Sequence, residues 1–373
     1  MSCLSCFCLQ IGNPLLEFNT DANSPAEYWW SHGLISDATF ENLTSVCNSS
    51  EIFRQEVIRG GPLSPACDAV ANQFEREVPG HLINQYDVTL DVCLSSVEAQ
   101  SFQLRKTVKI DVCIGDETVT YFNRPDVQEA LHARVTNWTI CSNGGVLEYD
   151  MKNHEIPMLP VLGDLVKSGI RVLIYSGDQD SIIPLTSTRT LVNGLARDLG
   201  LQTNVPYRVW VQEKQVAGWT QVYSDALSYA TIRGAGHEAP ISQPKRSLLL
   251  FTSFLRGKPL PKALISGNLR SFQGVFRPNH GGLDIGGDQD SIIPLTSTRT
   301  LVNGLAEDLG LQTNVPYRVW FEEKQVVGRT QVYSDALSYA TIRGAGHKAP
   351  ISQPDRSLLL FTSFLTGMPL PKA

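Results

Sequence analysis

The chain has 373 residues, of which 42% are hydrophobic and 18% are charged, and this composition is typical of a globular protein that buries a core. Its formal net charge is −6 and its basic residues are scattered along the chain, which argues against a protein that binds nucleic acid. No apolar run reaches the length of about 18 residues that a membrane-spanning helix needs, so we expect no membrane span.

The first part of the chain predicts short helices separated by loops. Residues 1–10 have no basic segment and no long apolar stretch, so they lack the pattern of a signal peptide. Ser24 and Pro25 form a typical helix start, with serine as the cap and proline in the first turn, and Gly33 would end that helix. An irregular exposed loop is expected over 94–120, and further helices are expected after Ser36, over 65–78, over 126–133 and over 160–167.

Two strands in the middle of the chain each end at a side chain that can transfer protons. The apolar run Val172-Leu173-Ile174-Tyr175 stops at a turn that contains Asp178 and Asp180. A second run, over 228–233, stops at a glycine-rich turn that contains His237. A strand that ends in a turn brings the next polar side chain to the edge of its sheet. The sequence therefore predicts an acid and a histidine on loops that follow strands.

This order of residues suggests a catalytic role for the pair. An acid followed by a histidine is the second and third member of the Ser…Asp…His order of α/β-hydrolases. In such a triad the carboxylate orients the imidazole, which takes a proton from the serine. Asp180 is preferred to Asp178 as the acid, because the acid in such folds lies three residues past the strand-ending glycine, here Gly177. The alternative is that Asp180 tightens a turn and His237 is an ordinary loop histidine.

The segments after Asp180 predict the rest of a sheet with helices on it. Residues 186–199 form an amphipathic pattern typical of a helix, residues 207–211 alternate as a strand, and residues 215–223 suggest another strand. Pro244 starts a last helix. Three apolar residues at helical spacing would cover the sheet, namely Leu248, Phe251 and Leu255.

Several separated blocks over residues 11–263 resemble plant serine carboxypeptidase-like proteins. The blocks are GNPLLEF, SHGLISD, DVQEALHA, YSGDQDSIIP and GWTQVYSDALSYATIRGAGHEAPISQP. The resemblance implies the α/β class, with an α/β-hydrolase core and a helical insertion, here roughly residues 20–140, over the active site. It also implies serine-dependent removal of C-terminal amino acids from peptides, or acyl transfer in the branch of the family that uses sugar esters. By resemblance, Asp180 and His237 match the family's acid and base.

The resemblance also implies two disulfides. It pairs Cys47 with Cys67 and Cys93 with Cys113, so that each bond closes a local loop in the insertion. Cys141 then has no partner, because its counterpart in the family bonds to the N-terminal half of the protein.

Other features bear on the compartment and on cofactors. Asn42, Asn48 and Asn137 each begin a glycosylation sequon, which supports passage through the secretory path. By resemblance, the protein is expected to be secreted or vacuolar. No histidine or cysteine cluster has the spacing of a zinc site and no cofactor motif occurs, so we expect neither a metal nor a cofactor.

The nucleophile of a triad is missing from this sequence. No G-x-S-x-G occurs in the 373 residues, so no nucleophile elbow is predicted. In the family that serine lies upstream of the residues that match Gly12, and residues 1–10 match nothing in the family. We therefore expect a truncated α/β-hydrolase fold that lacks the N-terminal strands and does not hydrolyse peptides as written. We also expect exposed sheet edges through which the chain can associate.

The end of the chain repeats an earlier part. Residues 287–373 (the second copy) match residues 177–263 (the first copy) at an offset of 110, with nine differences over 87 positions. Asp290 and His347 reproduce the acid, the histidine and their separation of 57 residues. Solenoids need three or more short repeats, so this is a tandem duplication or an error of sequence assembly, with a linker over 264–286.

We expect the second pair to be idle. The segment before Asp290, residues 280–286, is rich in glycine where the first copy has the apolar strand 170–176. Without that strand, nothing rigid would hold Asp290 within hydrogen-bonding range of His347. Lys348 also places a positive charge beside this histidine, which disfavours the imidazolium that catalysis requires.

Three functions remain open at this stage. The chain is a serine carboxypeptidase that acts on peptides, an acyl-glucose-dependent acyltransferase that acts on acyl esters, or a non-enzymatic remnant of either. The residues that would separate the two enzymes lie largely in the missing half. The sequence therefore does not decide between them.

Overall fold

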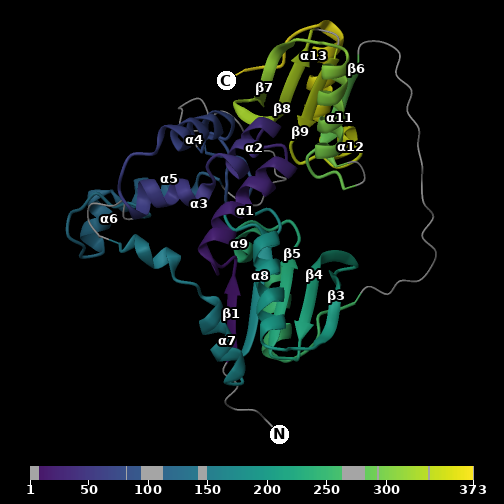
Figure 1. Ribbon diagram of the computed structural model, residues 1–373. Coiled ribbons are helices and arrows are strands. Elements are labelled where there is room, and N and C mark those ends of the chain that lie inside the picture. The colour runs from purple at the N-terminus through teal and green to yellow at the C-terminus, as the bar shows by residue number, and fades with distance from the viewer. Residues whose placement is uncertain are drawn as a thin grey trace.

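A computed structural model of the chain describes residues 8–80, 82–93, 112–141, 149–262, 282–291, 294–334 and 337–372. It contains two sheets, one for each copy, with helices α1 and α2 lying between them (Figure 1). Over the part of the chain that is described, no helix is both long and apolar enough to cross a membrane.

The elements follow one another in the order that Figure 1 labels. The strands are β1 (Cys8–Gly12), β2 (Arg171–Gly177), β3 (Thr203–Gln212), β4 (Gln215–Tyr223), β5 (Leu227–Ile232), β6 (Gly282–Gly287), β7 (Thr313–Glu322), β8 (Gln325–Tyr333) and β9 (Leu337–Ile342). The α-helices are α1 (Phe18–Ser31), α2 (Asp37–Ser45), α3 (Ser49–Phe53), α4 (Pro65–Glu77), α5 (Ile114–Phe122), α6 (Pro125–Ala130), α7 (Leu159–Lys167), α8 (Leu185–Asp198), α9 (Ala239–Ser242), α10 (Pro244–Leu255), α11 (Leu295–Asp308), α12 (Ala349–Ser352) and α13 (Pro354–Thr366). A π-helix, Arg54–Ile58, follows α3, and a 3-10 helix, Met151–Glu155, precedes α7.

The first sheet has the strand order β1-β2-β5-β4-β3. Strands β1, β2 and β5 are parallel, whereas β4 and β3 run antiparallel to their neighbours. Along β2 the side chains alternate between the two faces. Val172 and Ile174 pack in the core that contains α7 and α8, and Leu173 packs in the core that contains α10. Because helices cover both faces, every position in the middle of β2 is apolar.

Helices α1 to α4 form a separate core beside the first sheet. The disulfide Cys47–Cys67 joins the end of α2 to the first turn of α4, and the disulfide Cys93–Cys113 joins the segment after the helices to the start of α5. Both disulfides that the resemblance implied are therefore formed. The buried side chains of this core include Ala26, Trp29, Leu34, Ile35, Leu43 and Val70.

Helix α1 begins earlier than the sequence predicted. Its cap is Glu17, whose carboxylate accepts the backbone N–H groups of Asn19 and Thr20, so that Pro25 lies inside the helix. Proline removes one backbone donor from a helix interior. Here the Ser24 hydroxyl donates to the Asp21 carbonyl, four residues before the proline, at 2.9 Å. The predicted start at Ser24 is therefore wrong, because a carboxylate cap seven residues upstream, Glu17, was not considered.

The predicted irregular loop over 94–120 is wrong for its last part. Residues 114–120 belong to α5, whose first turn carries Asp116 and Glu117, and acidic side chains there stabilise the helix dipole. Residues 94–111 of that predicted loop lie outside the described residues.

The second sheet has the order β6-β9-β8-β7. Strand β6 pairs in parallel with β9 along its whole length, so residues 282–286 are strand and the linker predicted over 264–286 is wrong there. The remainder of that predicted linker lies outside the described residues. A glycine-rich segment can serve as this strand because the ladder uses backbone N–H and C=O groups, which every residue other than proline has. In the described part of the chain, no strand flanks β6 as β1 flanks β2.

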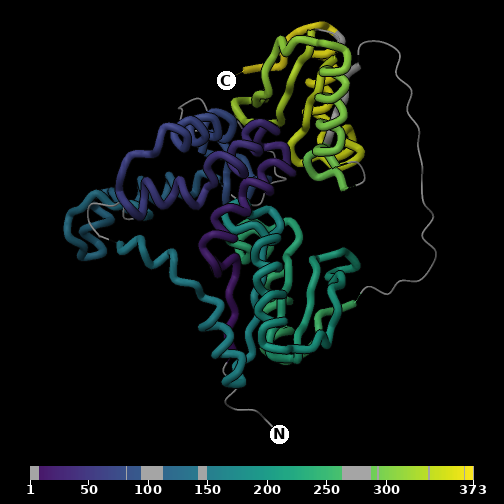
Figure 2. Tube along the Cα trace, viewed as in Figure 1, coloured from purple at the N-terminus to yellow at the C-terminus, as the bar shows by residue number. Residues whose placement is uncertain are grey.

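The two copies lie on opposite sides of residues 18–93 (the helical region), which carry helices α1 to α4. In Figure 2 the first copy, drawn in teal to green, lies below α1, and the second copy, drawn in green to yellow, lies above α2. The ends of β2 and β5 therefore face the helical region from one side. This arrangement brings helical-region residues onto the candidate site.

Candidate active site

Asp180 lies in the turn after β2 and is completely buried. Its Oδ1 accepts the backbone N–H groups of Ile182 and Ile183 at 2.8 and 3.3 Å. Its Oδ2 lies 2.8 Å from the Nδ1 of His237 and accepts the side-chain amide of Asn13 at 2.6 Å. Four neighbours therefore fix the orientation of this carboxylate.

His237 follows β5, the neighbour of β2 in the sheet. Because the two strands are parallel, their carboxyl ends place the acid loop and the histidine loop at the same edge. The hydrogen bond from Asp180 raises the pKa of His237 above its ordinary value, against the opposing effect of burial. The side chain is 29% exposed, and within the described ranges no serine hydroxyl is hydrogen-bonded to the imidazole. The Nε2 atom is thus the one left to accept a proton.

A segment of the helical region, residues 85–88, ties the two loops together. The Tyr86 carbonyl accepts the backbone N–H of His237 at 2.6 Å, and the Gln85 carbonyl accepts the Ser181 hydroxyl at 2.7 Å. The rings of Tyr86 and His237 also pack edge to face, with 5.4 Å between ring centroids. No sequence pattern had assigned this segment to the site.

Asn13 is a further site residue that sequence reasoning missed. It is buried in the left-handed region, at a φ of 45°, and its backbone N–H donates to the Tyr175 carbonyl at 2.8 Å. Its side chain accepts the N–H of Gly177 at 3.3 Å and donates to Asp180. The available signal was an asparagine directly after a strand and before a proline, since asparagine tolerates positive φ better than most residues.

Asp178 has a different role from Asp180. Its Oδ1 accepts the backbone N–H of Gly234 at 2.6 Å and the side-chain amide of Gln179 at 3.0 Å, so it joins the acid loop to the histidine loop. Burial raises the pKa of Asp178. The carboxylate that reaches His237 is therefore that of Asp180, the one preferred from the sequence.

The second pair is also formed. The Nδ1 of His347 lies 2.9 Å from the Oδ2 of Asp290, so the expectation that Asp290 would be out of range is wrong. The reason is β6, which supplies the strand that the sequence did not predict. The second pair is more open than the first, because the side chains of His347 and Asp290 are 43% and 7% exposed. Lys348 beside it is exposed.

The three predicted glycosylation acceptors lie in different surroundings. The side-chain amide of Asn42 donates to Gln73 at 2.8 Å, and the side-chain oxygen of Asn48 caps α3 by accepting the N–H of Glu51 at 2.9 Å. Asn137 is exposed. Glycosylation at these positions stays a prediction.

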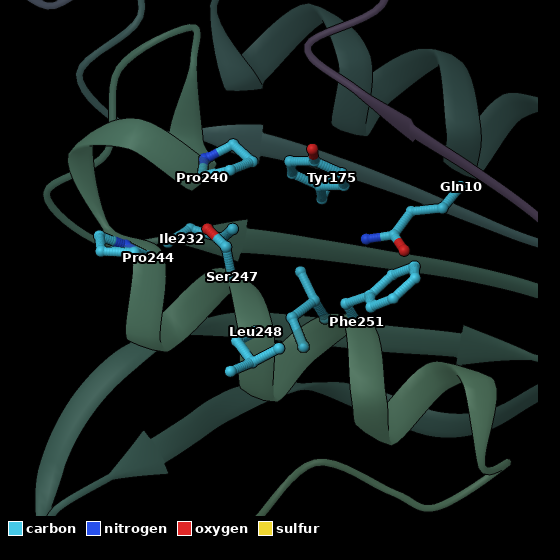
Figure 3. Close-up of a pocket in the computed structure, with 9 residues that line it drawn as sticks. Gln10, Tyr175, Ile232, Pro240, Pro244, Ser247, Leu248 and Phe251 are labelled. Atoms are coloured by element: carbon cyan, nitrogen blue, oxygen red, sulfur yellow. The ribbon is translucent and has the colours of Figure 1, made fainter.

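A cavity of about 570 Å³ opens between β1, β2 and α10 (Figure 3). The side chain of Gln10 reaches towards it from β1, and the ring of Phe251 faces it from α10. Neither Asp180 nor His237 lines this cavity, so we do not assign it to the substrate. Its remaining lining residues are mostly apolar and include Tyr175, Ile232, Pro240, Pro244 and Leu248.

Comparison with known proteins identifies relatives that cover most of the chain. The family described as serine carboxypeptidase matches residues 7–257 and 284–367, which include most of both copies. The expectation that residues 1–10 match nothing in the family is therefore wrong for residues 7–10. Serine carboxypeptidase-like 45 from Arabidopsis thaliana is 56% identical over 260 residues, which cover 68% of this chain and 55% of the relative. Serine carboxypeptidase-like 46 from the same plant is 54% identical over 264 residues, with coverages of 68% and 55%.

More distant relatives show the same relationship. Serine carboxypeptidase II-1 from Hordeum vulgare is 36% identical over 265 residues, which cover 68% of this chain and 75% of the relative. Among solved structures, Kex1, a prohormone-processing carboxypeptidase from Saccharomyces cerevisiae, aligns with a TM-score of 0.47 at 18% identity over 67% of this chain and 54% of that chain. The chain spans about half the length of the two Arabidopsis relatives. By the family match and by these identities, the chain belongs to the serine carboxypeptidase family, with its α/β-hydrolase fold.

Proposed function

We propose that Asp180 and His237 are the acid and the base of a serine carboxypeptidase site, which removes the C-terminal residue of a peptide. The observation that carries the proposal is the 2.8 Å contact between the His237 Nδ1 and a completely buried carboxylate. A carboxylate held in this way keeps the proton on Nδ1 and leaves Nε2 as the proton acceptor. The raised pKa of His237 also favours the imidazolium that forms during the reaction.

The chemistry then follows the triad scheme. His237 Nε2 takes the proton of a serine hydroxyl while the serine oxygen attacks the carbonyl of the last peptide bond. The imidazolium next gives this proton to the leaving amine, and water later cleaves the acyl-enzyme with His237 again as the base. Asp180 stays ionised and stabilises the imidazolium in both steps.

We further propose that the 373 residues alone do not carry out this reaction. They contain no G-x-S-x-G, and loss of the nucleophile from such a triad costs a factor of about 10⁶ in turnover. The second pair would be idle for the same reason. In addition, Lys348 puts a positive charge next to His347, where Glu238 follows the first histidine.

Two other functions are outcomes of the same test. An acyltransferase would use the same pair with an acyl ester as donor, and a non-enzymatic remnant would fold without any serine chemistry. The two disulfides favour an oxidising compartment, which supports a secreted or vacuolar location for each possibility.

The test compares two proteins made in a eukaryotic secretory host. One is the chain of 373 residues, and the other is the protein read from the full transcript. Each is treated with a fluorophosphonate that labels reactive serines, and each is assayed with an N-blocked dipeptide and with an acyl-glucose. We expect the first protein to be unlabelled. We expect the second to be labelled and to release the C-terminal amino acid.

Substitutions then test the roles of the two pairs. His237→Ala in the longer protein should remove activity, whereas His347→Ala, the matched change in the second copy, should leave it unchanged. Labelling of the 373-residue chain, or full activity of His237→Ala, would contradict the proposal. Turnover of acyl-glucose without peptide cleavage would assign the acyltransferase instead.

A further inference from the structure

The second copy docks on the loop between α1 and α2 through polar contacts. Arg299 on α11 donates to the Ile35 carbonyl at 2.8 Å and to the Asp37 carboxylate at 3.0 Å. Asn303, one turn further along α11, donates to the same carboxylate at 2.7 Å. The Tyr317 hydroxyl donates to the Gly33 carbonyl at 2.8 Å. A second set of contacts joins Arg343 and Gln325 to Asp91 and Val92 of the helical region.

These five docking residues are unchanged in the first copy, where their counterparts lie at the surface of the described part of the chain. The corresponding positions are Arg189, Asn193, Tyr207, Gln215 and Arg233, and all five are exposed. The contrast is largest at the arginine, because Arg299 is 1% exposed in the second copy. Tyr207, the counterpart of Tyr317, is 40% exposed.

The uncovered surface already has the conformation of the covered one. The Arg189 guanidinium lies 5.7 Å from the centroid of the Tyr207 ring, and the Arg299 guanidinium lies 5.4 Å from that of Tyr317. One helical turn further along, the side-chain oxygens of Asn193 and Asn303 accept the hydroxyl groups of tyrosines on β4 and β8, Tyr223 and Tyr333. The amide N–H₂ of each asparagine is left to donate outwards. Little ordering would therefore be needed for the first copy to bind the loop that the second copy binds.

The placement of the copies allows this contact to close between two chains. In Figure 1 the strand order from β2 to β3 runs from left to right in the lower sheet, and the order from β6 to β7 runs from right to left in the upper sheet. Helices α8 and α11 both lie on the viewer's side, and both sheets turn their histidine loops towards the helical region. The two sheets therefore face the helical region from opposite sides. Because each chain would offer both the docking surface and the bound segment, an isologous contact is satisfied twice in a dimer and leaves no open end.

We propose that the first copy carries a docking surface for the helical region of another molecule of this chain. The residues of this surface are Arg189, Asn193, Tyr207, Gln215 and Arg233. The segment bound would be Gly33–Asp37, with its Asp37 carboxylate on Arg189. Residues 287–373 of the same molecule then compete for residues 33–37. They occupy this segment at high effective concentration and keep the chain a monomer.

One difference between the copies favours the exchange. Arg329 is 2% exposed near Tyr317, and its two terminal nitrogens have no hydrogen-bond partner among the described residues. The first copy has Trp219 at this position, and it is partly exposed. Burying an unpartnered guanidinium costs free energy, whereas burying an indole releases it. The surface of the first copy is therefore the better match for the loop.

A charge exchange in the full chain tests the proposal, because the duplication supplies the matched control. Asp37→Arg alone repels Arg299 and Arg189 alike. Adding Arg189→Asp restores the pair only between chains, and adding Arg299→Asp restores it only within the chain. Sedimentation velocity over a range of concentrations measures the mass of each variant, and circular dichroism checks its fold.

We expect Asp37→Arg/Arg189→Asp to show a twofold rise in mass with concentration. Asp37→Arg/Arg299→Asp, Asp37→Arg and the unchanged chain should stay monomeric. A folded Asp37→Arg/Arg189→Asp chain that stays monomeric would overturn the proposal, and so would equal association of both double variants.

A second set of variants serves if Asp37→Arg does not fold. Arg299→Ala/Arg343→Ala leaves the helical region intact and releases it from the second copy, so this variant should dimerise. Adding Arg189→Ala/Arg233→Ala should return it to a monomer. Dimers that persist after the added pair would show that association uses another surface, such as a sheet edge, and would overturn the proposal.

Discussion

The two copies differ at nine of 87 positions, yet their acid–histidine pairs lie in different surroundings. The distance from the histidine Nδ1 to the carboxylate is 2.8 Å in the first copy and 2.9 Å in the second. Only in the first copy do Asn13 and the segment 85–88, both from the N-terminal part of the chain, reach the pair. The local sequence is thus enough to form the hydrogen bond. Burial and additional donors are supplied by the rest of the chain.

The largest effect is expected from removing the buried tryptophan of either copy. Trp210 on β3 and Trp320 on β7 are completely buried, and each indole N–H donates at 3.0 Å to a threonine carbonyl two strands away in its sheet, on β5 or β9. Truncation to alanine should cost roughly 3–5 kcal/mol of the free energy of unfolding. Hydrogen exchange with mass spectrometry should show loss of protection in the strands of the mutated copy alone. Loss of protection in both copies after one substitution would show that they unfold together.

The next effect is expected from Asn13→Gly. Glycine keeps the positive φ, so the change removes the side-chain contacts to Asp180 and Gly177 without straining the backbone. A buried carboxylate that loses a donor should lower the free energy of unfolding by about 1–3 kcal/mol. Chemical denaturation measures this, and the nuclear magnetic resonance signals of the His347 ring should not move. If they shift as much as those of His237, the two sites are coupled in a way the contacts do not explain.

A smaller effect is expected in the pH dependence of stability. Because the pKa of His237 is raised by Asp180, its contribution is complete below the ordinary histidine pKa of about 6.5 and is lost as the pH rises through the folded-state pKa. His237→Gln should therefore destabilise the chain more at about pH 5 than at about pH 9. Urea unfolding at several pH values gives this difference, and His347→Gln serves as the matched control. A difference that grows with pH would mean that burial outweighs the hydrogen bond.

The smallest effect is expected from exchanging the charges beside the histidines. Glu238 and Lys348 are both exposed, so Glu238→Lys and Lys348→Glu should each change the free energy of unfolding by less than about 0.5 kcal/mol. Imidazole titration by nuclear magnetic resonance is the more sensitive measurement, since a cation beside the ring disfavours its charged form. No response at His237 to Glu238→Lys would remove one of the two arguments that the second pair is idle.

The sequence predicted the parts of the site that depend on neighbouring residues. Asp180 and His237 follow apolar runs that end in glycine-containing turns, and short apolar runs bounded in this way favour buried strands. The start of α1 was mispredicted because Glu17 and Ser24 satisfy backbone groups that a rule based on proline leaves open. Strand β6 was missed because its ladder with β9 needs no apolar side chains.

Other parts could not be read from neighbouring residues. Asn13 and the segment 85–88 contact the site only after the chain has folded, and neither carries a motif that names its partner. The same is true of Arg299, whose counterpart Arg189 has the same local sequence and is exposed. Which of two nearly identical surfaces is covered depends on tertiary placement, and this is where the structure adds most.

The contact between Asn13 and Asp180 also orders events during synthesis. The two residues are 167 positions apart, so at ribosomal speeds β1 and Asn13 leave the ribosome roughly ten to thirty seconds before their partners exist. Strand β6 and its partner β9 are 55 residues apart, so their pairing waits only about a third as long. Strand β1 must therefore stay unpaired until the first copy has been made, whereas the described strands of the second sheet all come from residues 282–342. During that interval the backbone N–H and C=O groups of β1 lack their partners in β2 and are open to pairing with other strands.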